Sequence, residues 1–345
     1  MSEDRITLTR PDDWHLHLRD GAVLPAVLPA TTRCFARAIV MPNLQPPVAT
    51  VEAAAAYRER IRAALPEHAA FEPLMTLYLT DATTPEEIAR AAQSGFVQAV
   101  KYYPPGATTN SDSGVTSLER ARPALEAMQA HDLPLLMHGE VTDPDVDTFD
   151  REAVFIERHL APLLRDLPGL RVVLEHVTTR EGVDFVREAD ARIGATVTAH
   201  HLLLNRNALF DGGLRPHHYC RPLLKRETHR RALVDAVTSG HPRFFLGTDS
   251  APHPRGAKEA GCGCAGVYSA PAAIELYAEV FAAEGALDRL EAFAAFHGPD
   301  FHGLARNTDT ITLERREWTM PDTLAPEAGG IVPLRAGQPI PWRLA

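Results

Sequence analysis

Short apolar segments recur along the chain, and each is followed by a longer segment with the spacing of a helix. The apolar segments are too short for independent helices, and most are apolar on both faces. Strands that are buried on both faces of a parallel sheet have this pattern. We therefore predict eight strands, at 14–18 (WHLHL), 38–41 (AIVM), 74–79 (LMTLYL), 99–103 (AVKYY), 134–138 (PLLMH), 172–177 (VVLEHV), 196–202 (TVTAHHL) and 244–249 (FFLGTD).

Helical patterns lie between these strands, at 51–65, 84–93, 117–129 and 149–164. The second begins with a good start signal, in which Thr84 can cap the helix, Pro85 takes the first position and two glutamates follow. Strands that alternate with helices predict a (β/α)8 TIM barrel, and an open doubly wound sheet is the alternative. No linker or repeat divides the chain, so we expect residues 1–345 to form one domain, with a proline-rich tail from about Pro321 packed across the barrel.

Composition narrows the class of protein. Hydrophobic residues are 45% and charged residues 23%, which is typical of a globular protein. The formal net charge of −10 argues against nucleic acid or an anionic membrane as a partner. The N-terminus is polar, no apolar run is long enough to cross a membrane, and four cysteines make no disulfide framework. We expect a cytoplasmic protein with reduced thiols.

Histidine and aspartate side chains occupy the predicted strands in a way that suggests a metal centre. His15 and His17 are two residues apart, so they share one face of their strand and can meet one divalent cation. His138, His176 and Asp249 end three further strands. The strand ends of a barrel converge at the face where active sites are built, and polar groups at core-facing positions are costly unless they have partners. Each histidine alone would be read as an ordinary buried or surface residue.

Lys101 lies inside an otherwise apolar strand. A buried ammonium without a partner is expensive and tends to lose its charge. One interpretation is a lysine at the strand rim whose amine reaches water. The other is a lysine that CO2 converts to a carbamate, whose two oxygens could bridge two cations.

At these motifs the sequence resembles the amidohydrolase superfamily and, within it, the bacterial dihydroorotases. The resemblance covers nearly the whole chain. A histidine pair of the type H-x-H is common to the superfamily, whereas the joint set of motifs in this order is specific to this family. The matching segments are PDDWHLHLRDG, AIVMPNLQPPV, KYYPPGATTNSDSGV, LLMHGEV, EHVTT, NRN, GGLRPHHYCRPLLKR, FFLGTDSAPHPRGAKE and GCGCAG.

The resemblance implies a cofactor of two Zn²⁺ per subunit. His15, His17 and Asp249 would hold one, and His138 and His176 the other. Carboxylated Lys101 and a hydroxide would bridge them. The implied reaction interconverts L-dihydroorotate and N-carbamoyl-L-aspartate in pyrimidine synthesis, with Asp249 moving the proton. Paired cations lower the pKa of water and polarise a carbonyl, and a nearby carboxylate can act as general base and then as general acid.

The resemblance also implies a set of substrate contacts. Arg19, Asn43 and His253 would bind the carboxylate of dihydroorotate, His138 would also contact substrate, and main-chain groups at Arg221 and Ala265 would bind the ring amides. Arg221 stands where we would expect an apolar residue. The loop 104–115 would act as a lid that brings Thr108 and Thr109 to the substrate.

Other interpretations remain at this point. A hydantoinase or allantoinase is a second enzyme class, although hydantoins lack the carboxylate that Arg19, Asn43 and His253 would bind. A non-catalytic scaffold is a third, although it predicts lost metal ligands and every such position is filled. Cys262 and Cys264 are interpreted as part of a loop near substrate, and His200 and His201 are given no role. The family also implies a homodimer.

Overall fold

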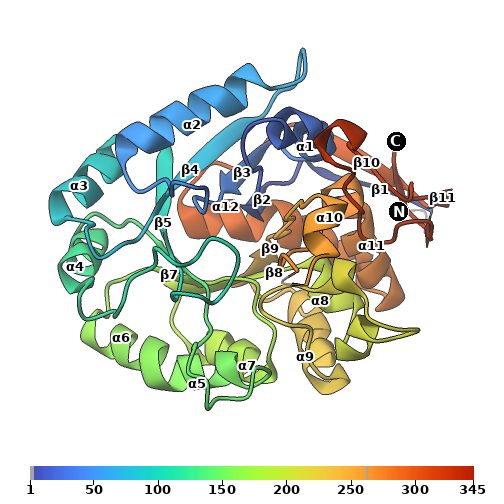
Figure 1. Ribbon diagram of the computed structural model, residues 1–345. Coiled ribbons are helices and arrows are strands. Elements are labelled where there is room, and N and C mark those ends of the chain that lie inside the picture. Colours follow the sequence, from blue (N-terminus) through green and yellow to red (C-terminus); the bar gives the residue numbers. More distant parts are fainter. Residues whose placement is uncertain (1–3, 262) are drawn as a thin grey trace.

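Eight parallel strands form a single sheet in the computed structural model, which describes residues 4–261 and 263–345. The sheet curls into a barrel with helices around it (Figure 1). His17 N donates to Ser250 O at 3.1 Å and Asp249 N donates to His15 O at 2.8 Å, so the first and last strands meet. The predicted TIM barrel is confirmed, and the open sheet is excluded. The barrel strands are β2 (Asp13–Leu16), β3 (Arg37–Val40), β4 (Glu72–Tyr78), β5 (Val97–Tyr102), β6 (Leu135–Met137), β7 (Val172–Leu174), β8 (Ile193–Val197) and β9 (Phe244–Leu246).

Helices connect successive strands and cover the outside of the barrel. The α-helices are α1 (Val23–Thr32), α2 (Val51–Ala63), α3 (Pro85–Gln93), α4 (Arg122–Ala130), α5 (Arg151–Phe155), α6 (Ala161–Asp166), α7 (Arg180–Glu188), α8 (Ala199–Leu203), α9 (Glu227–Thr238), α10 (Arg255–Lys258), α11 (Ala273–Ala283) and α12 (His297–His302). Two π-helical turns are η1 (Ile156–Leu160) and η6 (Ala292–Phe296). The 3₁₀ turns are η2 (Arg206–Leu209), η3 (Pro216–His218), η4 (Ala270–Ala272), η5 (Leu287–Arg289) and η7 (Pro326–Ala328).

Helix starts follow the local chemistry of the sequence. Thr84 caps α3, because its Oγ1 accepts from Glu87 N at 3.3 Å, as the start signal predicts. The helix predicted from residue 117 instead begins at Arg122. Pro123 then stands in the first turn, where its missing N–H costs nothing.

The strand predicted at 196–202 is wrong in its second half. Strand β8 ends at Val197, and Thr198 begins a new helix. Thr198 Oγ1 accepts from His201 N at 3.1 Å and satisfies one of the free N–H groups of α8. His200 and His201 therefore lie on a helix rather than on the barrel wall.

The hydrophobic core has two layers, as the two-sided burial of the strands requires. Phe301 of α12 and the nearby Leu304 pack against one set, which fills the barrel interior. This set consists of Trp14, Ile39, Met41, Leu74, Ala99, Leu136, Val173 and Phe245. The larger set lies between the strands and the helices. The interior set closes one end of the barrel, so the opposite end is left for polar groups.

The chain ends form small sheets outside the barrel. Strand β1 (Arg5–Thr9) pairs antiparallel with β10 (Thr310–Glu314), which pairs with β13 (Arg343–Leu344). Strand β11 (Trp318–Thr319) pairs with β12 (Pro339–Ile340). The segment after Pro321 is anchored on the barrel, since Leu334 N donates to Tyr268 O at 2.8 Å and Arg335 Nη2 lies 2.6 Å from Glu279 Oε1.

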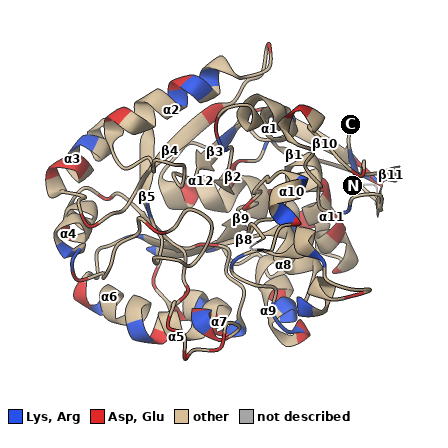
Figure 2. Ribbon diagram, viewed as in Figure 1, with Lys and Arg blue, Asp and Glu red and all other residues tan. Residues whose placement is uncertain are grey.

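Charged residues are spread along the ribbons of the outer helices (Figure 2). Among the described residues, no helix is both long enough and apolar enough to span a bilayer.

Candidate active site

Three of the predicted metal ligands converge where β2 and β9 end. His17 Nε2 lies 3.0 Å from Asp249 Oδ1, His15 Nε2 lies 3.3 Å from the same oxygen, and the two Nε2 atoms are 3.3 Å apart. Ligand atoms that are ~2.0–2.1 Å from one tetrahedral zinc lie about 3.3 Å from each other. The three side chains are thus already spaced as ligands of one cation.

The remaining predicted ligands lie next to these three. The rings of His138 and His176 have centroids 4.8 Å apart, and His176 is 5.1 Å from the ring of His15. Ligand atoms of His15, His176 and Asp249 all lie within 4.8 Å of one another. His176 and Asp249 have φ values of 40° and 44°, which residues other than glycine rarely adopt. Strain of this kind is concentrated at functional sites.

Neighbouring oxygens select which ring nitrogen each histidine presents. The Glu175 carboxylate contacts His15 Nδ1, and Asn43 Oδ1 lies 2.9 Å from His17 Nδ1, so both rings present Nε2. Glu140 Oε2 lies 2.8 Å from His138 Nε2, which leaves Nδ1 of that ring. An oxygen partner on the second nitrogen is the usual companion of a metal-binding histidine.

The charge states of these groups also suit cation binding. Burial lowers the pKa of His17 to about 3 and the pKa of His176 well below its usual value, so both rings are neutral and have a lone pair to share. Burial alone would raise the pKa of Asp249, but His15 and His17 hold it well below its usual range. Neutral imidazoles with one carboxylate are common zinc ligands.

Lys101 lies on β5 beneath this cluster. Its side chain is fully buried, and its Nζ has no hydrogen-bond acceptor in the described part of the chain. Glu175 Oε2 is 4.0 Å away, and the Tyr103 ring centre is 5.1 Å away. Burial lowers the pKa of Lys101 to about 8. A buried amine without an acceptor fits a lysine that is modified when the metal centre is complete.

Arg19 lines the same cavity, and its Nη1 lies 3.5 Å from His17 Nδ1. Its guanidinium donates from Nε to Pro252 O at 3.2 Å, and Nη2 lies 2.9 Å from His253 Nε2. Burial and the charge of Arg19 lower the pKa of His253 to about 2, so this ring is neutral. His253 Nε2 also lies 3.0 Å from Ala265 O. Within the described ranges Arg19 forms no ion pair, which leaves its positive charge available.

The predicted lid loop lies over the cavity. Thr109 Oγ1 is 3.4 Å from Ala265 O, and Asn43 Nδ2 donates to Thr109 O at 3.0 Å. Asn110 Nδ2 in turn donates to Asn43 O at 3.0 Å. Asn43 therefore links the lid to His17, a connection that its predicted role as a carboxylate contact does not include.

All predicted site residues except Lys101 and His253 line one cavity. Its lining is His15, His17, Arg19, Asn43, Tyr103, Thr108, Thr109, His138, His176, Arg221, Asp249, Ala251, Ala265 and Gly266. The side chain of Arg221 donates from Nη1 to Thr148 Oγ1 at 2.7 Å, so its main chain is free to face the cavity. Cys262 lies outside the described residues, so the interpretation of the Cys262–Cys264 motif concerns Cys264 alone.

Several buried carboxylates at the site were missed by the sequence analysis. Besides Glu175 and Glu140, Asp13 accepts from His15 N at 3.1 Å and from Thr248 Oγ1 at 2.6 Å, which ties β2 to the end of β9. Glu152 on α5 accepts from the backbone N–H groups of Thr178 and Thr179 at 2.9 and 2.8 Å, just after His176. The sequence could have predicted an inward direction for Glu175, because Glu175 shares a strand face with inward-facing Val173.

Comparison with known proteins agrees with this architecture. Residues 12–315 match the Amidohydrolase family. A dihydroorotase from Nitrosomonas europaea is 65% identical over 344 residues, or 99% of each chain. The crystal structure of dihydroorotase from Campylobacter jejuni matches with a TM-score of 0.91 at 34% identity, over 100% of this chain and 98% of that one. Dihydroorotase from Saccharomyces cerevisiae, solved in complex with 5-fluoroorotic acid, matches with a TM-score of 0.91 at 33% identity over 99% and 98%. This chain therefore belongs to the amidohydrolase family and, within it, to the dihydroorotases.

Proposed function

We propose that the protein interconverts L-dihydroorotate and N-carbamoyl-L-aspartate at this cavity, with two divalent cations, Zn²⁺ in the simplest case. The observation that carries the proposal is Arg19, a cation with no ion-pair partner among the described residues, in the same cavity as the ligand set of His15, His17 and Asp249. A cyclic amide that bears a carboxylate fits this arrangement, because its carboxylate can bind Arg19 while its amide lies at the ligand set. The dihydroorotase relatives support the same substrate.

His15, His17 and Asp249 would hold one cation, and His138 and His176 the second. Lys101, converted to a carbamate, would supply an oxygen to each. When bound, the two cations would polarise the amide carbonyl and lower the pKa of a water molecule. The protein itself would transfer the proton and orient the substrate.

The carbamate forms readily because burial favours the neutral amine of Lys101. Its lone pair attacks the carbon of CO2, a new N–C bond forms, and one proton leaves to solvent. A pKa of about 8 gives the chain a useful fraction of neutral amine at neutral pH. The product is an anion, which replaces a costly buried ammonium with a group that two cations neutralise.

Asp249 is placed to move the proton. In hydrolysis the oxygen of water bonds to the ring carbonyl carbon, the ring C–N bond breaks, and the amide nitrogen gains a proton. Asp249 takes the proton from water and passes it to that nitrogen, first as general base and then as general acid. Its depressed pKa means that it begins as a carboxylate, ready to accept.

The rest of the cavity orients the substrate. Arg19 offers a planar pair of donors to the carboxylate, which is the geometry that a guanidinium matches best. The lid residues Thr108 and Thr109 exclude water, and main-chain groups at Arg221 and Ala265 would bind the ring amides. His253 keeps the Arg19 guanidinium in place, since the two are 2.9 Å apart.

The family further supports an assignment to pyrimidine synthesis in the cytoplasm, by a homodimer. We also propose that residues 1–345 act as one metal-dependent hydrolase domain, in which the segment after Pro321 braces the barrel. Light scattering of the purified protein tests the dimer, and a stable core that includes both chain ends after limited proteolysis tests the single domain.

The decisive experiment measures metal content and turnover together. The protein should hold about two zinc ions per chain and hydrolyse dihydroorotate far faster than hydantoin. Asp249→Asn should lower kcat about 10²–10⁴-fold through the proton-transfer role. Metal-loaded protein that fails to turn over dihydroorotate, or an Asp249→Asn variant with near-normal kcat, would reject the proposal.

A further inference from the structure

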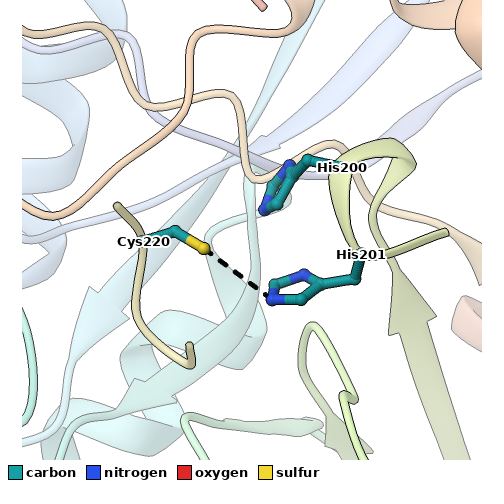
Figure 3. Close-up of side chains that lie close together, drawn as sticks. All are labelled: His200, His201 and Cys220. Atoms are coloured by element: carbon teal, nitrogen blue, oxygen red, sulfur yellow. Dashed lines mark hydrogen bonds between the residues drawn. The ribbon is translucent and has the colours of Figure 1, made fainter. Parts of the chain in front are cut away.

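A second group of potential metal ligands lies outside the catalytic cavity. His200 and His201 lie on α8, and Cys220 lies in the loop that follows η3. One ligand atom from each lies within 4.8 Å of the other two. Figure 3 shows the Cys220 sulfur directed at the His201 ring, with the His200 ring beside them. All three side chains are buried, with at most 2% of each residue exposed.

His200 has no visible reason to be buried. Neither of its ring nitrogens has a hydrogen-bond partner among the described residues. A buried polar group that lacks a partner costs roughly 1–3 kcal/mol. Burial lowers its pKa to about 4, so the ring is neutral and has a lone pair available. A missing partner that accepts this lone pair would remove the cost.

His201 and Cys220 are already in contact. Cys220 Sγ lies 3.8 Å from His201 Nε2. The other nitrogen of His201 lies 2.7 Å from Thr198 Oγ1, which can hold the ring with Nε2 toward the sulfur. The rings of His200 and His201 have centroids 4.5 Å apart. The sulfur and the two rings therefore form one compact group of potential ligands.

We propose that His200, His201 and Cys220 bind one thiophilic divalent cation such as Zn²⁺, at a site separate from the catalytic pair. Two imidazoles and one thiolate are ligands that zinc prefers, and three protein ligands leave a fourth position for water. Ligands of a tetrahedral zinc lie roughly 3.3–3.8 Å apart, so small side-chain rotations would complete the site. The proposal does not depend on the proposed reaction.

Binding would require two exchanges. His201 Nε2 lies 3.0 Å from Pro222 O, and Cys220 Sγ donates to the same oxygen at 3.3 Å. The cation must replace both contacts. Burial raises the pKa of the Cys220 thiol to about 12, so the thiol releases one proton to solvent as the S–metal bond forms. Affinity should consequently increase with pH.

Cobalt(II) gives this site a signature that the catalytic centre lacks. The ligands proposed for the catalytic pair are nitrogen and oxygen atoms, whereas Cys220 is a thiolate. Full-length protein is titrated with Co²⁺, and thiolate-to-cobalt charge transfer is followed in the near ultraviolet. We expect the saturated band to correspond to about one thiolate-bound cobalt per chain, in addition to cobalt held by the catalytic ligands, and to weaken as the pH is lowered.

Variants then assign the ligands. Cys220→Ser should abolish the band, and His200→Leu should weaken cobalt binding at this site at least about tenfold. His200→Leu should fold well, because it replaces a ring without hydrogen bonds by an apolar group. Cys264→Ser and Cys34→Ser are matched controls that change the other described free cysteines, and both should keep the band.

The native protein supplies an independent test. Crystals soaked in Zn²⁺ should show anomalous scattering between His200, His201 and Cys220, in addition to any signal in the catalytic cavity. The proposal is overturned by the absence of that peak, by a native protein without the cobalt band, or by a band that survives in Cys220→Ser and is lost in Cys264→Ser.

Discussion

Arg19 is the most informative residue to change, because it separates recognition of the substrate from chemistry. Its guanidinium reaches the cavity from the loop after β2 and is held by Pro252 O and His253. Arg19→Met keeps an unbranched apolar stem and removes both the charge and the donors. The proposed metal ligands His15 and His17 are unchanged, so metal content should remain near that of the native protein.

The size of the effect follows from the surroundings of the guanidinium. Truncating one side of a buried charge pair costs about 2–5 kcal/mol. Arg19 is only partly buried, so water screens the pair and the lower part of that range applies. A loss of about 2–3 kcal/mol corresponds to a decrease in kcat/KM of about 30–150-fold. The net charge of −10 repels an anion at long range, so no other general attraction compensates.

The assay compares dihydroorotate with dihydrouracil, the same ring without the carboxylate, at equal zinc content. Arg19→Met should impair only the first substrate, and Arg19→Lys should remain impaired because it lacks the planar fork. Arg221→Met is the matched comparison, an arginine in the same cavity whose side chain binds Thr148, and it should cost less than about tenfold. An equal loss on both substrates in Arg19→Met would show that Arg19 does not recognise the carboxylate.

Three further predictions concern the metal bridge, pH and stability. Native protein should carry the extra mass of one CO2, which acid removes, and native mass spectrometry measures it. Lys101→Ala should lose both cations, which elemental analysis detects. A fully active protein without the extra mass would contradict the carbamate. Burial lowers the pKa of His302 from 6.5 to about 3, so folding favours its neutral form and stability falls as the pH drops below 6.5. Between pH 7.5 and 5.5 the titration of His302 should lower the free energy of unfolding by about 1.4 kcal/mol. In urea unfolding, His302→Leu should lack this decrease. The same pH dependence in both proteins would refute the prediction. Glu152→Ala should lower the free energy of unfolding by about 3–5 kcal/mol, because it leaves buried N–H groups of Thr178 and Thr179 without acceptors. Exposed Glu157→Ala is its control and should change stability by less than about 0.5 kcal/mol, and similar values for the two variants would be inconsistent with the role of Glu152.

The barrel was predictable because its strands are buried on both faces and therefore stand out as apolar runs. The prediction failed where an apolar run continued past the end of a strand. In the segment 196–202 apolar residues continue through α8, and only the cap at Thr198 marks the boundary. The strand β1 was also missed, since it pairs with β10 some three hundred residues away and lies outside the barrel pattern.

The convergence of the candidate ligands was predictable from chemistry, because histidines and a lysine in apolar strands need a reason to be there. Most of the groups that orient those side chains were not, because a buried carboxylate has no sequence pattern of its own; Glu175 is the exception, since it follows inward-facing Val173 on the same strand face. Asn43 illustrates the same point. Its position after β3 indicated a role at the site, but only the folded chain shows it between His17 and the lid loop.

The segment from β7 to His176 shows why the alternation of side chains along a strand could not predict every residue of the site. Val173 faces the barrel interior, so the regular alternation of β7 turns Glu175 inward. His176 would then face outward, but its φ of 40° breaks the alternation and returns the ring to the cavity. The same local departure occurs at Asp249, whose φ is 44°. Two adjacent residues can therefore both serve the site, His176 facing the cavity and Glu175 orienting His15, because β7 ends at Leu174 and the chain leaves the regular alternation after it.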